Sequence, residues 1–172
     1  MPTIIEFKAK TNDLAKAEQR LLTLNPTFIG IDNQKDTYYN ITNGRLKLRE
    51  GNIENALIHY TRANTPDTKQ SNVLLYKHKP SEDLKKILET VHGIKVVVEK
   101  RRKIYFVNNV KIHFDEVSPL GSFIEVEAID DDNEFTVEEL QVQCNFYVNF
   151  FDINIEDFQA NSYSDLLLAA KV

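Results

Sequence analysis

Positively charged side chains alternate with other residues along the short segment that holds Arg45, Lys47 and Arg49. In an extended strand, residues two positions apart point to the same face, so these three cations would form a row. Cations in such a row repel one another, and either a wet outer surface or a bound polyanion must offset the repulsion. The same alternation pairs Lys8 with Lys10 and Lys100 with Arg102, and it places Arg62 on one face with Tyr60.

Carboxylates follow the same two-residue spacing. Glu125 and Glu127 share one face, Asp115 shares a face with His113, and Glu6 precedes the first pair of lysines. Converging carboxylate oxygens are the ligands that hard cations such as Mg²⁺ and Mn²⁺ prefer. If the charged faces point inward, they predict a site for a metal and a polyanion with several phosphates; if they point outward, they form a solvated surface.

The elements that must position these residues are mostly strands. Alternating or β-branched segments predict strands at 3–10, 27–42, 45–50, 56–63, 72–79, 94–107, 110–117 and 121–129, with a polar loop at 64–71. Helices are predicted from the cap Asn12 to about Leu24, from Ser81 to Gly93, after the capping box of Thr136 and Glu139, and as short pieces within 155–170. The pattern indicates an α+β fold with a large antiparallel sheet or barrel. A closed barrel of about eight strands has a narrow interior, which would bring inward charges together.

Composition limits the classes of protein. The 172 residues suit one domain, and 21 Lys and Arg against 26 Asp and Glu give a net charge of −5, which argues against a nucleic-acid-coating protein. No apolar run approaches the roughly 20 residues that cross a bilayer, and no signal peptide is predicted, so we expect a cytoplasmic protein without a membrane partner. The single cysteine, Cys144, predicts a buried apolar residue rather than a disulfide or a catalytic thiol.

Six segments occur in an order that resembles a known family. They are Ile-Glu-Phe-Lys-Ala-Lys (5–10), Asp-Thr-Tyr-Tyr-Asn (36–40), Gly-Arg-Leu-Lys-Leu-Arg-Glu (44–50), Glu-Lys-Arg-Arg (99–102), His-Phe-Asp-Glu-Val (113–117) and Leu-Gly-Ser-Phe-Ile-Glu-Val-Glu (120–127). This order resembles the CYTH proteins: class IV adenylyl cyclases, thiamine triphosphatases and inorganic triphosphatases. The tail at 162–167 is similar to the end of a class IV cyclase-like member. The resemblance implies one CYTH domain over residues 1–172, folded as an eight-stranded antiparallel closed β-barrel, the triphosphate tunnel, with flanking helices.

The resemblance also implies roles for the charged residues. Mg²⁺ or Mn²⁺ would be held by Glu6, Glu125 and Glu127, with Asp115 counted beside them. The triphosphate would be bound by Lys8, Lys10, Arg45, Lys47, Arg49, Arg62, Lys100 and Arg102. The family opens with Glu-x-Glu-x-Lys, but this chain has Ile4 at the first glutamate. The departure leaves open whether one metal binds or two.

Three functions follow from this resemblance. The first is a class IV-type adenylyl cyclase that converts ATP to cyclic AMP and pyrophosphate. The second is a triphosphatase acting on inorganic, thiamine or nucleoside triphosphate, and the third is a non-catalytic module that binds polyphosphate or a nucleotide. Aromatic residues could stack on a base or simply pack the barrel, and His113 could contact phosphate, tune Asp115 or be structural. The oligomeric state stays open, a homodimer included.

Overall fold

The computed structural model describes residues 3–61 and 69–171. Its strands are β1 (Thr3–Thr11), β2 (Thr27–Tyr39), β3 (Arg45–Glu50), β4 (Ala56–Thr61), β5 (Lys69–Lys77), β6 (Ile94–Val107), β7 (Val110–Val117) and β8 (Gly121–Asp130). Its helices are α1 (Leu14–Leu22), α2 (Glu82–His92), α3 (Val137–Phe150), the short 3-10 helix η1 (Ile155–Asp157) and α4 (Tyr163–Ala170). The described residues contain no helix long and apolar enough to cross a membrane.

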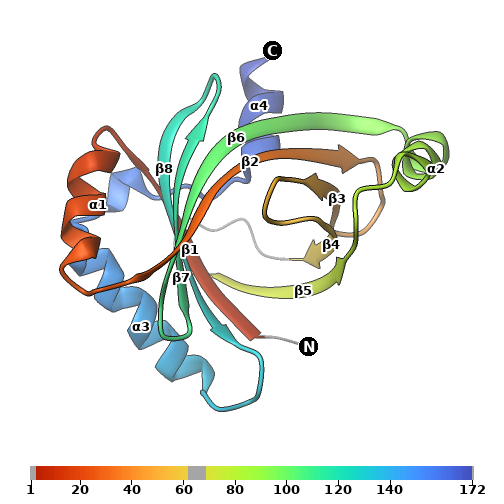
Figure 1. The fold of residues 1–172 in the computed structure, drawn as a ribbon. Helices are drawn as coiled ribbons and strands as arrows, with labels where there is room; N and C mark the ends of the chain where they lie inside the picture. The colour runs from red at the N-terminus through yellow and green to blue at the C-terminus, as the bar shows by residue number, and fades with distance from the viewer. Residues whose placement is uncertain (1–2, 62–68, 172) are drawn as a thin grey trace.

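The strands form one strongly curled antiparallel sheet in the order β1-β5-β4-β3-β2-β6-β7-β8. β1 pairs with β5 on one side and with β8 on the other, so the pairing returns to the strand at which it begins. Figure 1 shows α1 and α3 beside β1, β7 and β8, and α2 at the opposite side of the molecule. This arrangement confirms the predicted α+β class, with eight antiparallel strands and flanking helices.

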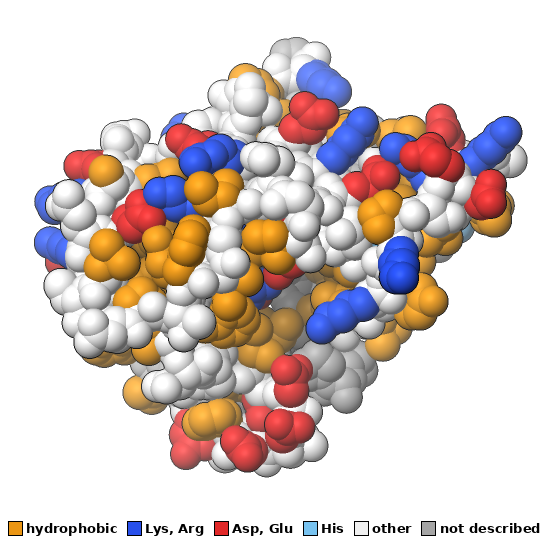
Figure 2. Space-filling view, in the orientation of Figure 1, with side chains coloured by type: hydrophobic (Ala, Val, Ile, Leu, Met, Phe, Trp, Pro, Cys, Tyr) orange, Lys and Arg blue, Asp and Glu red, His pale blue; other side chains and the backbone are white. Residues whose placement is uncertain are grey.

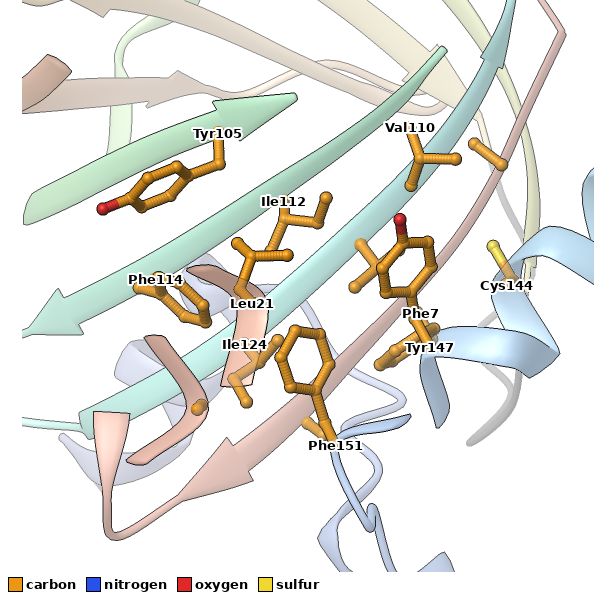
Figure 3. Close-up of a cluster of buried hydrophobic side chains, with 14 of the residues drawn as sticks. Phe7, Leu21, Tyr105, Val110, Ile112, Phe114, Ile124, Cys144, Tyr147 and Phe151 are labelled. Atoms are coloured by element: carbon orange, nitrogen blue, oxygen red, sulfur yellow. The ribbon is translucent and has the colours of Figure 1, made fainter. Parts of the chain in front are cut away.

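The largest core cluster lies between these helices and the sheet. Phe7, Ile112 and Ile124 project from β1, β7 and β8 toward Leu21 of α1 and Cys144 of α3 (Figure 3). Because neighbouring residues of a strand point to opposite faces, the charged residues between these apolar ones must point away from the helices. The helical layer therefore settles the orientation that the sequence left open: the charged faces of β1, β7 and β8 point into the curled sheet.

Element boundaries differ from the predictions at a few places. The cap of α1 is Asp13 rather than Asn12, because the Asp13 carboxylate accepts a bond from the Lys16 backbone N–H at 2.9 Å. β2 ends at Tyr39 instead of residue 42, and β5 begins at Lys69, inside the predicted loop at 64–71. Residues 62–68, which hold the rest of that loop and Arg62, lie outside the described residues.

Local signals explain the elements that were predicted well. Thr136 and Glu139 form the capping box of α3, and Ser81 caps α2. Gly44 and Gly93 adopt φ of 76° and 71°, in the left-handed region that favours glycine, at the β2–β3 turn and just past α2. Cys144 is fully buried, as predicted, with its Sγ 3.2 Å from the Ile5 carbonyl oxygen.

Candidate functional site

The inner faces of the strands surround a cavity of about 460 Å³. In Figure 2, hydrophobic, basic and acidic side chains meet around a hollow in the face that is shown. Among the described residues, the cavity lining carries seven basic side chains: Lys8, Lys47, Arg49, Lys77, Lys100, Arg102 and Lys111. It carries four acidic ones: Glu6, Glu54, Glu125 and Glu127. The lining therefore has an excess of positive charge, inside a chain whose net charge is −5.

Strand register brings acids and bases together in rows. Glu6 of β1 lies opposite Glu127 of β8, and Glu127 lies opposite Lys111 of β7. One row further along, Lys8 lies opposite Glu125, and the Lys8 Nζ is 3.8 Å from Glu125 Oε1. Antiparallel partners share a face, so both rows point into the cavity.

Arg102 is held rigidly at the junction of β6, β7 and β8. Its Nε and Nη2 donate to the two oxygens of Asp115 at 2.7 and 2.6 Å, and Nη2 also donates to Glu125 Oε2 at 2.6 Å. The Tyr163 hydroxyl donates to the same Asp115 carboxylate at 2.7 Å. Burial would raise the pKa of Asp115, but Arg102 outweighs it and holds that pKa below its ordinary value. Asp115 thus positions Arg102 from behind and does not line the cavity.

Asp36 gathers three cations at the other side of the site. Arg49 donates to both of its oxygens at 2.9 Å, the Lys100 Nζ donates at 2.7 Å, and the Lys47 Nζ lies 3.4 Å away. Burial acts to raise the pKa of Asp36, but these cations together hold it well below its ordinary value. Burial, with repulsion from Arg49 and Arg102, lowers the pKa of Lys100 to about 7 despite the contact with Asp36. The cluster can thus accept additional negative charge.

A turn between β3 and β4 adds another ion pair to the cavity. The Asp32 carboxylate accepts the backbone N–H groups of Ile53 and Glu54, both at 2.9 Å, and so fixes this turn. Glu54 then forms an ion pair with Lys111 of β7 and accepts a bond from Arg49 Nη1 at 3.1 Å. The pair connects parts of the sheet that β2 and β6 separate.

A group of residues suitable for a metal lies at the β7–β8 side. His113, Glu125 and Glu127 each offer a ligand atom, and these atoms lie within 4.8 Å of one another. Burial, reinforced by Glu125 and Glu6, raises the pKa of Glu127 to about 7 against the effect of Lys111. The neighbouring cations therefore do not fully neutralise the carboxylates around Glu127, and a bound divalent cation would add the missing positive charge. The oxygen-rich donor set fits Mg²⁺ or Mn²⁺.

His113 is buried beside Glu125. Its Nδ1 lies 3.4 Å from Glu125 Oε2, while its buried Nε2 has no hydrogen-bond partner among the described residues. Burial, together with Arg102 and Lys111, lowers the pKa of His113 to about 3. The imidazole is neutral near pH 7, which is the form that can accept a hydrogen bond or ligate a metal.

Most of the predicted site residues meet in this cavity. Those that line it are Glu6, Lys8, Lys47, Arg49, Lys100, Arg102, Glu125 and Glu127. Lys10 is exposed, near Gly121, and Arg45 binds Asp165 of α4 at 2.7 Å instead of lining the cavity. Arg62 lies outside the described residues.

Sequence reasoning gave no role to three charged residues of the site. Asp36 lies in a quoted segment and two positions before Tyr38, so alternation could have placed it inward. Lys111 likewise precedes His113 by two positions. Glu54 lies in a turn, where no periodicity exists to reveal it. Tyr38 and Tyr60 line the cavity, whereas Tyr39 packs in a separate cluster with Leu48 and Leu88.

Comparison with known families decides the assignment. The sequence pattern of the family described as CYTH domain matches residues 3–148. The chain belongs to the CYTH family. The match covers every strand and most of α3, so it includes all the cavity residues from the sheet, while α4 with Tyr163 lies beyond it. The comparison thereby confirms the family, and with it the prediction of a CYTH-type enzyme.

Solved structures with the same fold extend over nearly the whole chain. The PH1012 protein of Pyrococcus horikoshii is 22% identical, with a TM-score of 0.83 over 95% of this chain and 98% of that one. A Vibrio parahaemolyticus protein described as a proposed adenylate cyclase is 17% identical, with a TM-score of 0.79 over 96% and 97%. A proposed adenylyl cyclase from Hippeastrum is 13% identical, with a TM-score of 0.63 over 100% and 97%. At these identities the likeness shows the fold alone. A search of curated proteins gave no match.

Proposed function

We propose that this CYTH protein is a divalent-metal-dependent enzyme that acts on triphosphates inside the bore of its sheet, with the class IV adenylyl cyclase reaction as the first candidate. The observation that carries the proposal is the cavity itself, in which seven basic side chains exceed four acidic ones among the described lining residues. Asp36 and Asp115, which lie behind the lining, offset part of this positive charge, and a bound polyanion would offset more of it. A chain of phosphates satisfies several fixed cations at once.

The cations would act by binding and by neutralising charge. Arg49, Lys100 and Lys8 can donate to oxygens along the triphosphate, and Arg102 is held by Asp115 and Glu125 at the side of the candidate metal group. Such fixed donors stabilise the charge that develops on phosphate oxygens during transfer. Their carboxylate partners keep them in place before substrate arrives, so little reorganisation is needed.

The metal would be held by carboxylates at the β1–β8 side of the cavity. Glu6, Glu125 and Glu127, with the neutral His113, are the residues that would ligate Mg²⁺ or Mn²⁺. A bound divalent cation supplies Lewis-acid neutralisation of phosphate oxygens. Ile4 lines the same cavity two positions before Glu6, where it contributes no oxygen ligand. We therefore propose that one metal is held by protein ligands, and that any second metal depends on substrate oxygens and water.

Two reactions suit this arrangement. In cyclisation, the ribose 3′ oxygen loses its proton and attacks the α-phosphorus of ATP, and pyrophosphate leaves; in hydrolysis, water attacks the terminal phosphorus, the remaining diphosphate leaves, and orthophosphate is formed. The whole-chain resemblance to class IV cyclases favours the first. The Hippeastrum protein of the same fold is described as a proposed adenylyl cyclase with a dominant triphosphatase activity, which makes hydrolysis the second candidate.

Product analysis tests the proposal. The purified protein is incubated with ATP and with inorganic triphosphate, each with Mg²⁺ and with Mn²⁺, and the products are separated by chromatography. Cyclic AMP with pyrophosphate establishes the cyclase, and orthophosphate without cyclic AMP establishes a triphosphatase. Binding without any product would leave the non-catalytic module, with Ile4→Glu as the first change to make. Absence of both binding and product would refute the proposed site.

A further inference from the structure

Lys111 is a cavity cation that lies among carboxylates. It projects from β7, where it lies opposite Glu127 of β8, and it forms an ion pair with Glu54 of the β3–β4 turn. Glu127 in turn lies opposite Glu6 of β1. All four residues line the cavity, so one ammonium group is placed beside acidic side chains that come from different parts of the sheet.

The candidate metal group lies directly beside this lysine. His113 follows Lys111 by two positions on the same face of β7, a distance of about 7 Å along the strand. Glu127 belongs to the metal group and is also the register partner of Lys111. In sites with two metals the ions lie about 3.5–4 Å apart, so a second ion that shared Glu127 would lie close to the Lys111 ammonium.

The described residues contain one group of side chains placed to hold a metal, and the carboxylates beside it are already engaged. Glu54 pairs with Lys111 and also accepts a hydrogen bond from Arg49 Nη1 at 3.1 Å. The next inward residue of β1 beyond Glu6 is Ile4, which offers no oxygen ligand. A divalent cation needs several converging oxygen ligands, and one placed beside Glu54 would be repelled by both Lys111 and Arg49.

We propose that the Lys111 ammonium takes the place of a second divalent cation, so that this protein binds its triphosphate with one metal ion and one lysine side by side. The inference rests on the proposed function and goes beyond it, because it assigns the second position to a side chain of the protein. An ammonium group has three N–H donors, so Lys111 can bind phosphate oxygens while it keeps Glu54 as a partner. Its charge is present at every Mg²⁺ concentration, whereas a second metal must be bound from solution.

The test compares two lysines that each form an ion pair with a glutamate. Lys111→Met removes the ammonium and keeps most of the length of the side chain, whereas Lys111→Arg keeps the charge. The matched control is Lys103→Met on β6, because Lys103 binds Glu18 of α1 at 2.6 Å and does not line the cavity. Lys111→Gln, which can still donate to Glu54, is the second variant if Lys111→Met does not fold.

The first measurement counts the Mn²⁺ ions bound per chain, from the electron paramagnetic resonance signal of the free ion. We expect one bound ion for the wild-type protein, for Lys111→Arg and for Lys103→Met. We expect two for Lys111→Met and for Lys111→Gln, because Glu54 and Glu127 lose the cation beside them and become available as ligands.

The second measurement is the dissociation constant for inorganic triphosphate, by calorimetry in EDTA, where no metal contributes. Lys111→Met should raise this constant about tenfold or more, because one charge-assisted hydrogen bond to phosphate is lost. Lys111→Arg should raise it by less than about threefold, and Lys103→Met should leave it unchanged. A role limited to joining Glu54 to β7 would move neither this constant nor the Mn²⁺ count.

The outcomes separate the two proposals. A wild-type count other than one, or equal counts with and without the Lys111 ammonium, would overturn the inference and leave the proposed function to the product analysis. An unchanged dissociation constant for Lys111→Met would overturn it in the same way. If the wild-type protein binds neither Mn²⁺ nor triphosphate, the proposed function fails and this inference fails with it.

Discussion

Glu125 connects the basic side chains of the cavity with the candidate metal group. It accepts a hydrogen bond from Arg102 Nη2 at 2.6 Å, and it is one of the three residues suited to hold a metal. Replacing Glu125 or Glu127 by Gln keeps the shape and removes the charge. Under the proposed function we expect each change to lower kcat by about 100-fold or more, since one lost stabilising contact typically costs about 2.7–4 kcal/mol in the barrier. Steady-state turnover with Mg²⁺ or Mn²⁺ measures the effect.

The matched control for this prediction is Glu116→Gln on β7. Glu116 binds Arg101 on the exposed surface, at 2.9 Å, and does not line the cavity. Its removal should leave turnover unchanged. Turnover that survives both Glu125→Gln and Glu127→Gln would show that the metal group is assigned to the wrong residues.

Asp36 is completely buried and has three cations around it. Asp36→Asn should lower the free energy of unfolding by about 3–5 kcal/mol, because Arg49 and Lys100 lose a buried counter-ion. The pKa of Asp36 is held below its ordinary value, so its contribution is fully present above about pH 4 and is lost as pH falls toward the folded-state pKa. Urea unfolding at pH 7 and across pH 3–5 should show a large deficit at pH 7 that shrinks on acidification. A deficit that is small at pH 7, or independent of pH, would contradict this role.

At the scale of elements, α4 completes the site from beyond the sheet. Ser162 and Asp165 cap the helix, and Asp165 also binds Arg45 of β3. These contacts place Tyr163 so that its hydroxyl reaches Asp115 and its ring lies 3.9 Å from the Lys8 Nζ. α4 thus links a cavity cation of β1 to the carboxylate that positions Arg102.

Two substitutions separate the two contacts of Tyr163. Tyr163→Phe keeps the ring and removes the hydroxyl, so it should lower stability by roughly 1.5–3 kcal/mol with little change in KM. Tyr163→Leu also removes the aromatic face under Lys8 and should raise KM for the triphosphate several-fold. The exposed Tyr76 provides the control, since Tyr76→Leu should alter neither quantity. If Tyr163→Phe and Tyr163→Leu raise KM equally, the ring does not help to place Lys8.

Alternation explains why so much of the site could be predicted from the sequence. The period of two is imposed by the strand, so Lys8 and Glu6 had to share a face, and Phe7 between them had to take the other. The apolar residues at alternate positions, Phe7 and Ile124, were also the ones that pack on helices and so direct the charges inward. The capping box at Thr136 was predictable because its signal is local.

Contacts that depend on register and strand ends could not be derived in this way. The bond from Arg49 to Asp36 requires the particular β2–β3 register, which no local pattern specifies. Lys10 has the spacing of a cavity residue but lies at the end of β1, where the side chain is exposed. Arg45 is likewise near the start of β3, where α4 provides Asp165 as its partner. Spacing predicts to which face of the sheet a side chain points, but not how far along the strand, and so along the cavity, that side chain lies.

For the whole molecule, the charge distribution makes ligand binding a proton-linked event. The chain carries a net charge of −5, yet its cavity has more bases than acids among the described lining residues. Lys100 shows the consequence, because burial among other cations lowers its pKa to about 7. In the free protein at pH 8, Lys100 is therefore mostly neutral, and a bound polyanion would raise its pKa and restore the charge.

We therefore expect the protein to take up close to one proton per triphosphate bound at pH 8, and much less at pH 6, where Lys100 is already protonated. Calorimetry in buffers with different ionisation enthalpies measures this number. The Lys100→Met variant provides the reference, because proton changes on the triphosphate and at other groups remain when Lys100 is absent. The difference between the two proteins should appear at pH 8 and vanish at pH 6. If the wild-type protein and the Lys100→Met variant take up the same number of protons at pH 8 as well as at pH 6, Lys100 keeps its charge in the free protein. Asp36 would then offset the surrounding cations completely.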